Sequence, residues 1–533
     1  MKKPRGAGLT RRSALRLGAL GAASLALPHV ARAEGSKFLR FVPSADLAVR
    51  DPIFTTASVT ANHACMVFDT LYGVDENFDP QPQMVAGHTV ADDGLTWTMT
   101  LRPGLKFHDG EPVRARDVVA SLRRWGARDM YGQEVLARSN EILAVDDRTL
   151  RFRLKKRFNA LPAALGKNGP NICVIMPERL AATPATTQVT EMVGSGPYRY
   201  LAGEAMSGAR YVYEKFSGYV PRSEGVTSRM AGPKIAYFDR IEWKIIPDQS
   251  TAAAALQAGE VDWVESLNSD LAPLFDNSRD ATVHLSTDLL QSIIRFNWLQ
   301  PPFDRVEIRR ALIGMVSQTD YMTAAYGSDA RRWKDDVGFF TSNGPMGTSV
   351  GLEPLRGRRD MAKVKEALKA AGYQGEKVVL LQATDVDNLN GLANVAADEL
   401  KQAGMNVEVQ ASDWGSISQR RVNRGPLDKG GWSVFVTGLS NTIDPGGHLA
   451  LRANGAKAWF GWPDSPRLEE LRQQWFDAPD LAAQKKVCEA MQLQAMQDVP
   501  YLPVGEYRIL TACKKNLVGL PPGAPFFYGV RRA

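Results

Sequence analysis

The chain has 533 residues, of which 44% are hydrophobic and 23% are charged, an ordinary composition for a globular protein. One hydrophobic core stops growing near roughly 250–300 residues, so we expect two or more lobes. Lysine and arginine number 65 against 58 acidic residues, but seven basic and no acidic residues lie in 1–33. The rest of the chain is close to neutral, which argues against nucleic acid or an anionic lipid surface as a partner. It has no run of about 18 apolar residues, so no membrane span is expected.

Residues 1–33 are typical of an export signal. Arg11 and Arg12 are paired and precede a mildly apolar run, rich in glycine and alanine, at 17–27. The segment ends on the small-x-small pattern of a cleavage site, so we expect cleavage after Ala33 and a mature chain free in the periplasm. The twin arginine indicates the Tat pathway, and no cysteine follows the apolar run to carry a lipid anchor. The alternative is an arginine-rich disordered terminus.

The chain contains four cysteines, Cys65, Cys173, Cys488 and Cys513. They are too few for a disulfide scaffold, and none lies in a C-x-x-C pair. An oxidising compartment would allow a bridge such as Cys488–Cys513, but we favour buried free thiols.

The first predicted elements are rich in β-formers. A strand is expected at 37–42, followed by a loop at 43–56. The run 96–102 alternates polar and apolar residues and is followed by Pro-Gly and Asp-Gly turns, which predicts a half-buried strand. Apolar residues at 118–125 then recur at helical spacing. Together, residues 76–189 look like a small α+β unit.

Strand–helix–strand patterns follow. A strand at 242–246, an alanine-rich helix at 251–258 and a strand at 261–264 predict a parallel pair with a right-handed crossover. The pattern returns with helices and strands expected at 361–371, 377–382, 392–403, 406–410 and 432–436.

These patterns predict two α/β lobes, the second at about 290–490. A tail at 500–519, with a strand-like run at 507–511, is expected to return to the first lobe.

A series of short motifs is specific through its order, although each motif alone is weak. The motifs are Phe-Asp-Thr-Leu-Tyr at 68–72, the turn-containing run 95–113, 117–122, Val-Gly-Ser-Gly-Pro-Tyr at 193–198, Gly-Glu-Val-Asp at 259–262, the pieces between 296 and 312, and Asp-Pro at 444–445. With them the chain, from about 36 to 520, resembles the family 5 extracellular solute-binding proteins. That family includes dipeptide-, oligopeptide- and nickel-binding periplasmic proteins. One departure is Arg114, which stands where the family usually has a Thr or Asn helix cap, so local capping is in doubt.

The resemblance implies the type II periplasmic binding protein fold, an α/β fold with two lobes and an extra α+β subdomain on the first. The expected parts are the signal peptide 1–33, lobe I at 34–75 and 190–285, its subdomain at 76–189, lobe II at 286–498, and a return to lobe I at 499–533. A ligand would be enclosed between the lobes and delivered to the permease subunits of an ABC importer, with ATPase subunits in the cytoplasm. The binding protein itself would be a monomer. Hinge bending is expected near 284–295 and 499–510.

Enzyme signatures are missing from the sequence. It contains no H-E-x-x-H, G-x-S-x-G or G-x-x-x-x-G-K-[ST] motif. We therefore expect that the protein is not an enzyme and binds no cofactor. The mature chain's histidines, which do not pair at metal-ligand spacing, are His63, His88, His108, His284 and His448. We therefore predict no metal site, and nickel or haem binding stays open through family kinship alone. Two further functions stay open as well, a periplasmic enzyme and a chaperone-like protein.

Candidate ligand residues follow two strands of the second lobe, because ligands of open α/β sheets sit beyond the carboxyl ends of strands. Trp414 comes after the strand 406–410, and its indole could stack on apolar or cationic groups. The loop after 432–436 carries the remaining candidates Ser440, Asn441, Thr442 and Asp444. Competing interpretations are domain-edge packing for Trp414, turn formation for Asp444, and core packing for the aromatic residues at 459–462. On the first lobe the loop 43–56 is the corresponding position.

The resemblance also bears on the solute. Dipeptide-binding relatives hold the peptide ammonium with an Asp three residues before the Asp-Pro pair, where this chain has Asn441. They hold the carboxylate with an Arg that aligns with Asn390 or Gly391. Both charged anchors are thus replaced by neutral residues, and we expect free dipeptides to bind poorly. A shift of a few residues in this alignment would bring Asp444 into play.

Overall fold

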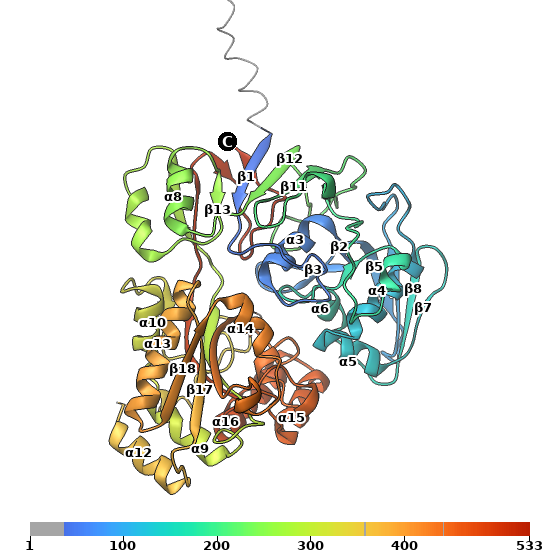
Figure 1. Ribbon diagram of the computed structural model, residues 1–533. Coiled ribbons are helices and arrows are strands. Elements are labelled where there is room, and N and C mark those ends of the chain that lie inside the picture. Colours follow the sequence, from blue (N-terminus) through green and yellow to red (C-terminus); the bar gives the residue numbers. More distant parts are fainter. Residues whose placement is uncertain (1–36, 357–358, 441) are drawn as a thin grey trace, which may run out of the picture.

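The computed structural model describes residues 37–356, 359–440 and 442–533. The export signal predicted at 1–33 and the candidate ligand residue Asn441 lie outside the described residues. Figure 1 shows two lobes, one above the other, with a third unit beside the upper lobe.

The first lobe is built on a seven-stranded sheet. Its order is β10 (Tyr198–Tyr200), β11 (Arg210–Lys215), β12 (Arg240–Lys244), β1 (Phe38–Val42), β13 (Trp263–Val264), β21 (Leu510–Lys514) and β14 (Ala281–Leu285). The predicted strand–helix–strand unit is β12, α8 (Gln249–Gln257) and β13. Its two strands are parallel to β1 and lie on either side of it, so they do not pair with each other. The alanine-rich α8 packs on the β13–β21 side of this sheet in an apolar cluster of its own.

The second lobe is built on a six-stranded sheet. Its order is β16 (Trp333–Lys334), β20 (Tyr501–Tyr507), β15 (Leu290–Phe296), β19 (Val434–Leu439), β17 (Lys377–Ala383) and β18 (Asn406–Ser412). Strand β17 is parallel to both β18 and β19, as expected of strands joined through helices. The helices of this lobe are α9 (Val306–Ala311), α10 (Gln318–Tyr326), α11 (Glu353–Arg356), α12 (Met361–Ala370), α13 (Asp387–Gln402), α14 (Trp414–Arg420), α15 (Pro466–Asp477) and α16 (Leu481–Asp498).

The two predicted helices that flank β17 end at glycines. Gly372 follows α12 with φ of 79°, and Gly404 follows α13 with φ of 88°. A side chain is strained at such positive φ values, which explains why glycine terminates each helix. α13 then packs its apolar face on β17 and β19.

The unit beside the first lobe, which we call the subdomain, is an antiparallel sheet with helices against it, built from elements between Val85 and Ala181. Its strands, in sheet order, are β5 (Val85–Val90), β6 (Thr96–Leu101), β8 (Thr149–Leu154) and β7 (Ser139–Ala144), and its helices are α4 (Ala115–Gly126), α5 (Met130–Arg138), α6 (Leu161–Leu165) and α7 (Glu178–Ala181). Along β6 the apolar residues are buried and the threonines are half-buried, as the alternation predicted. Helix α4 begins after Arg114, whose backbone N–H donates to the Asp117 carboxylate at 2.8 Å. The acidic residue in the first turn thus satisfies a backbone donor at this helix start.

Two short segments connect the lobes. β14 belongs to the first sheet and β15 to the second, so the chain crosses at 286–289; it crosses back at 508–509, between β20 and β21. Residues 501–507, assigned from sequence to the returning tail, therefore pair in the second lobe. The strand-like run 507–511 spans this crossing, and sequence pattern alone does not say which sheet a continuous β-rich run joins.

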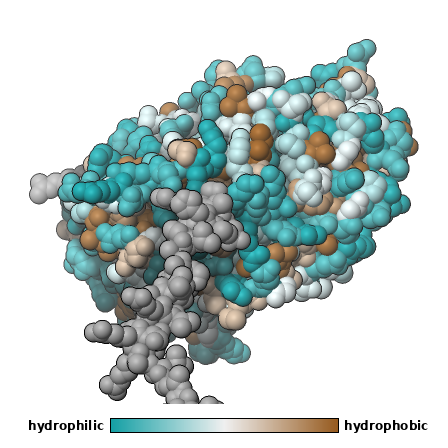
Figure 2. All heavy atoms as spheres, turned by 90° about the horizontal axis from the view of Figure 1, so that it is seen from above, coloured by the Kyte–Doolittle hydropathy of each residue, from teal (hydrophilic) through white to brown (hydrophobic). Residues whose placement is uncertain are grey.

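The remaining α-helix of the described chain is α3 (Ser58–Val67), and the remaining strands form three two-stranded pairs. The pairs are β2 (Asp69–Thr70) with β9 (Val174–Ile175), β3 (Tyr72–Val74) with β4 (Pro80–Pro82), and β22 (Leu517–Val518) with β23 (Arg531–Arg532). Figure 2 shows that the face seen from above is mainly hydrophilic, with apolar side chains scattered over it. Within the described residues, no helix has both the length and the apolar character that crossing a membrane requires.

Candidate functional site

A cavity of about 690 Å³ lies between the lobes. The first lobe contributes one side of α3, Glu265 after β13, Arg229 and the segment 522–525, and residues 76–78, 168–170 and Ile172 also line the cavity. The second lobe contributes Thr341, residues 343–345, Ser440 and Ile443. The crossing residues 286–290 and Ile509 lie between the two sides. Because its walls come from two lobes joined by two short segments, this cavity changes shape when the lobes move relative to one another.

Glu265 is the buried carboxylate of the first-lobe wall. It directly follows β13 and is 6% exposed. Its two oxygens accept hydrogen bonds from Asn62 Nδ2 on α3, at 2.8 Å, and from the backbone N–H of Ser44, at 2.7 Å. Burial raises the pKa of Glu265, while these neutral donors act in the opposite direction. The candidates on the second lobe were chosen because ligands of open α/β sheets sit beyond the carboxyl ends of strands. Glu265 lies at such a position, so the same rule would have identified it from sequence.

A second charged feature is an ion pair at the crossing. Arg229 donates to both carboxylate oxygens of Asp288, through Nη1 at 2.5 Å and through Nη2. The Arg229 side chain is 4% exposed and lies over the Phe78 ring, 4.2 Å from its centroid. Arg229, Asp288 and Phe78 all line the cavity. The only cation among its described lining residues is therefore already neutralised.

The second-lobe wall is uncharged among the described residues. It presents Thr341, Ser440, Ile443 and the segment 343–345 to the cavity. Thr341 shares a hydroxyl–hydroxyl hydrogen bond of 2.6 Å with Thr442, and its backbone N–H donates to the Thr442 carbonyl at 2.9 Å. These bonds hold the loop after β19 against the segment that follows β16.

The structure separates the residues proposed from sequence. Ser440 lines the cavity, and Thr442 is buried directly behind Thr341. Asp444 is buried and accepts hydrogen bonds from the Tyr131 hydroxyl at 2.8 Å and from the Gly447 N–H at 3.0 Å. Burial raises the pKa of Asp444. It therefore meets the subdomain and does not line the cavity.

Trp414 begins α14 and lies outside the cavity lining. Its backbone N–H donates to Asp385 Oδ1 at 2.7 Å, and the Arg421 guanidinium lies 5.0 Å from its ring centroid. The same guanidinium lies over the rings of Phe435, Trp459 and Phe460. Burial lowers the pKa of Arg421 to about 10. Trp459 and Phe460 thus pack around a half-buried cation.

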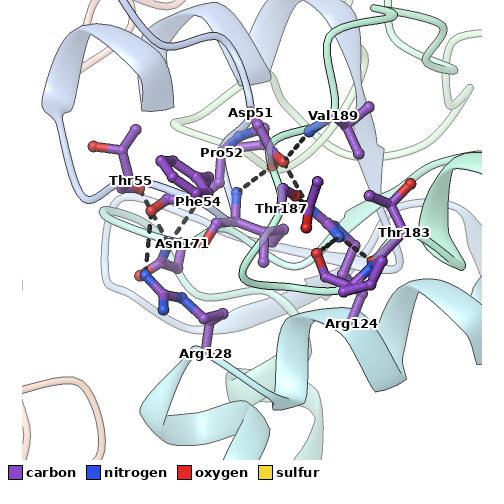
Figure 3. A network of polar contacts seen from close by, with 12 residues as sticks. Asp51, Pro52, Phe54, Thr55, Arg124, Arg128, Asn171, Thr183, Thr187 and Val189 are labelled. Carbon is purple, nitrogen blue, oxygen red and sulfur yellow. Dashed lines mark hydrogen bonds and ion pairs between the residues drawn. The ribbon is translucent and has the colours of Figure 1, made fainter.

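The loop 43–56 is fixed to the subdomain (Figure 3). Asp51 and Arg124 form a buried ion pair of 2.6 Å, and the same guanidinium donates to the Thr187 carbonyl at 3.0 Å. The Asn171 side-chain amide donates to three backbone carbonyls of the loop, including that of Thr55 at 3.1 Å. None of the described residues 43–56 lines the cavity. Helix α3 of the first lobe lines it instead, through residues that include Asn62 and Cys65. Sequence analysis missed α3 because its apolar residues show little helical periodicity.

All four cysteines are buried free thiols. Cys488 lies on α16 of the second lobe and Cys513 on β21 of the first, so the two candidates for a bridge belong to different lobes. Burial raises the pKa of Cys65, which lines the cavity, to about 12. Among the described residues, no three His, Cys, Asp or Glu side chains group so that they could hold a metal ion.

Helix α5 of the subdomain contacts the second lobe in what we call the cross-cleft contact. It joins Tyr131, Glu134 and Arg138 of α5 to Asp444, Gln473 and Asp477. Arg138 Nη1 donates to Asp477 Oδ1 at 2.8 Å, alongside the bond from the Tyr131 hydroxyl to Asp444. With these bonds formed, the two sides of the cleft are held together.

Two lobes, two crossing segments and an interlobe cavity of small-molecule size define a two-lobed binding protein. The model of the bacterial extracellular solute-binding proteins, family 5 (middle region), matches residues 79–457. The chain belongs to this family, and it is a periplasmic substrate-binding protein of an ABC transporter.

Individual relatives agree with this assignment. The chain is 36% identical over 535 residues to a probable peptide ABC transporter periplasmic-binding protein of Sinorhizobium fredii, covering 98% of this chain and 100% of the relative. It is 26% identical over 482 residues to a glutathione-binding protein of Pectobacterium atrosepticum, 88% of each chain. Its fold is similar to that of a Pseudoalteromonas dipeptide-binding protein solved with Met-Leu, with a TM-score of 0.78 at 20% identity, over 93% of this chain and 100% of that one.

Proposed function

We propose that the chain captures a peptide-like organic solute in the interlobe cavity and delivers it unchanged to the permease subunits of an ABC importer. The observation that carries this proposal is the cavity of about 690 Å³ with walls from both lobes. Small-molecule pockets span roughly 300–1,000 Å³. The names of the Sinorhizobium and Pectobacterium relatives refer to a peptide and to glutathione, which supports a peptide-like solute.

The proposal is tested by thermal unfolding of the purified protein with a panel of peptides, amines, organic acids, sugars, nickel and haem. A ligand that binds only the folded chain raises the unfolding temperature by mass action. Chromatography of the solute after incubation should recover it unchanged. Turnover would support a periplasmic enzyme, and protein partners without any small-molecule response would support a chaperone-like role.

Free dipeptides should bind poorly. The two family anchor positions carry the uncharged residues Asn441 and Asn390 or Gly391, and the last two lie on α13, away from the cavity lining. Burying the dipeptide carboxylate without a charged partner costs several kcal/mol, which lowers affinity about a thousandfold or more. Calorimetry with a dipeptide panel on wild type and Asn441→Asp tests this. Micromolar binding of ordinary dipeptides by the wild type would contradict it.

Export by the Tat pathway, with cleavage after Ala33, is supported by the pair Arg11-Arg12 in the sequence. The exported protein would act as a free monomer in the periplasm, with the importer's ATPase subunits in the cytoplasm. Arg11→Lys with Arg12→Lys should leave the precursor in the cytoplasm, because a receptor reads the pair. The matched control, Lys2→Arg with Lys3→Arg, should be exported normally. Periplasmic accumulation of the first double variant would exclude this route.

A further inference from the structure

The charged lining residues of the cavity all come from the first-lobe side and the crossing. Among the described lining residues they are Glu76, Arg229, Glu265 and Asp288, whereas the second-lobe wall is uncharged. Arg229 and Asp288 neutralise each other through a two-bond ion pair. The remaining charge in the lining is therefore negative.

The two remaining carboxylates differ in their surroundings. Glu76 is exposed to solvent, which screens its charge, and it accepts one hydrogen bond of 3.3 Å from the Ser228 hydroxyl. Glu265 is buried, and water has little access to it. A charge in such a place acts on a bound solute far more strongly than an exposed one, because the local dielectric constant is low.

Glu265 retains capacity to accept further hydrogen bonds. An ionised carboxylate has about four lone-pair sites, and the Asn62 amide, the Ser44 backbone N–H and the Ser44 side chain occupy three of them. All three donors are neutral, and no described lysine, arginine or histidine acts on this carboxylate. A buried carboxylate without a cation is costly, so an arriving positive group would be favoured.

We propose that the solute of this protein carries a protonated amine, and that Glu265 on the first lobe is the residue that selects it. The proposal rests on the proposed function of the interlobe cavity. A solute carboxylate has no comparable partner, because Arg229 would have to give up Asp288 to bind it. A solute with an amine and no buried carboxylate therefore suits the cavity best. This includes peptides whose carboxyl end is blocked or reaches solvent.

The experiment uses four forms of one tripeptide, Ala-Leu-Ala: free, C-amidated, N-acetylated, and blocked at both ends. Calorimetry measures each form on wild type, Glu265→Gln and Glu76→Gln. We expect the C-amidated cation to bind best and the N-acetylated anion worst. Glu265→Gln should weaken the cation at least about 30-fold and abolish the ranking, because losing one partner of a buried charge pair has effects of this size. Glu76→Gln should change binding less than about fivefold.

A third variant separates loss of the site from loss of the fold. Glu506→Gln removes another buried carboxylate, which lies outside the cavity lining and is bonded to Ser342. It should keep the ranking of the four peptides. Circular dichroism and unfolding curves of all variants identify any that fail to fold, and the ranking on wild type alone still decides the charge preference.

The possible outcomes distinguish the two proposals. One outcome is that no tripeptide form binds, while a non-peptide amine from the solute panel binds wild type and not Glu265→Gln. In that case the proposal of a peptide-like solute fails, and the selection of an amine by Glu265 holds. Tightest binding of an anionic or neutral form overturns the assignment of Glu265. So does an affinity for the cation that Glu265→Gln leaves unchanged, or a panel in which only organic acids or sugars bind.

Discussion

The hydrogen bond from Tyr131 to Asp444 joins the subdomain to the second lobe, so its removal should act on the opening of the cleft. The donor lies on α5 and the acceptor follows β19, with 2.8 Å between the two oxygens. Asp444 is buried and keeps a second donor, the Gly447 N–H. Tyr131→Phe removes the hydroxyl and retains the ring that packs edge-on against Phe476.

The magnitude follows from the charge of the acceptor. A hydrogen bond to a charged group contributes about 1.5–3 kcal/mol, and each 1.4 kcal/mol is a factor of ten. Only the closed arrangement contains this bond, so the ratio of open to closed molecules should rise about 10- to 150-fold in Tyr131→Phe.

Small-angle scattering of the ligand-free protein measures this change as a larger radius of gyration. Tyr373→Phe is the matched control, because the Tyr373 hydroxyl donates to the Glu376 carbonyl at 2.8 Å within the second lobe. That variant should lose stability without any change in radius. An unchanged radius for Tyr131→Phe, or an equal change in both variants, would refute the reasoning.

Three further predictions concern the cross-cleft contact, the stability of the fold in acid, and the ion pair that joins the loop 43–56 to the subdomain. Gly446→Ala should also open the cleft, since its Cβ would lie 2.3 Å from the Tyr131 ring, and an unchanged scattering radius would contradict this. Burial lowers the pKa of His448 to about 3, so the unfolded chain binds a proton near pH 6.5 that the folded chain does not. The contribution of neutral His448 to the free energy of unfolding is therefore complete above pH 6.5. It falls by about 1.4 kcal/mol per pH unit as the pH drops toward 3. The stability deficit of His448→Gln in urea unfolding should therefore shrink as the pH falls from 6.5 to 5, and a constant deficit would disprove it. Arg124→Met leaves the buried Asp51 carboxylate without its cation and should destabilise the protein by about 3–5 kcal/mol in urea unfolding, whereas a loss below 1 kcal/mol would argue against this.

Local elements of the fold were predictable because their signals are local. The alternation of threonines with buried apolar residues in β6 identifies its pleat, and Gly372 and Gly404 mark helix ends through their positive φ. The strand-like run 507–511 was recognised, but its division between two sheets was not. Sheet membership depends on which edges are free in the folded lobes, and one segment's pattern carries no information about that.

The site was predictable only in part, for a related reason. The rule that ligands sit beyond strand ends led to Ser440, which lines the cavity, and to Trp414, which packs beside Arg421 instead. Glu265 also follows a strand, but its importance depends on the burial and the cation-free surroundings that tertiary packing creates. Asp444 was singled out because its loop follows a strand, yet its partner Tyr131 lies 313 residues away in the chain. No local pattern links such a pair.

Native mass spectrometry of the protein purified from cells tests the central claim, capture of a small solute between the lobes, most directly. We expect one small molecule per chain, released unchanged on denaturation. A variant with the cavity filled from α3, Ala61→Phe, should be folded and free of that molecule, because Ala61 lines the cavity. If Ala61→Phe retains the molecule with wild-type occupancy, or if the wild type carries none and gains no stability from any solute of the panel, the account is contradicted.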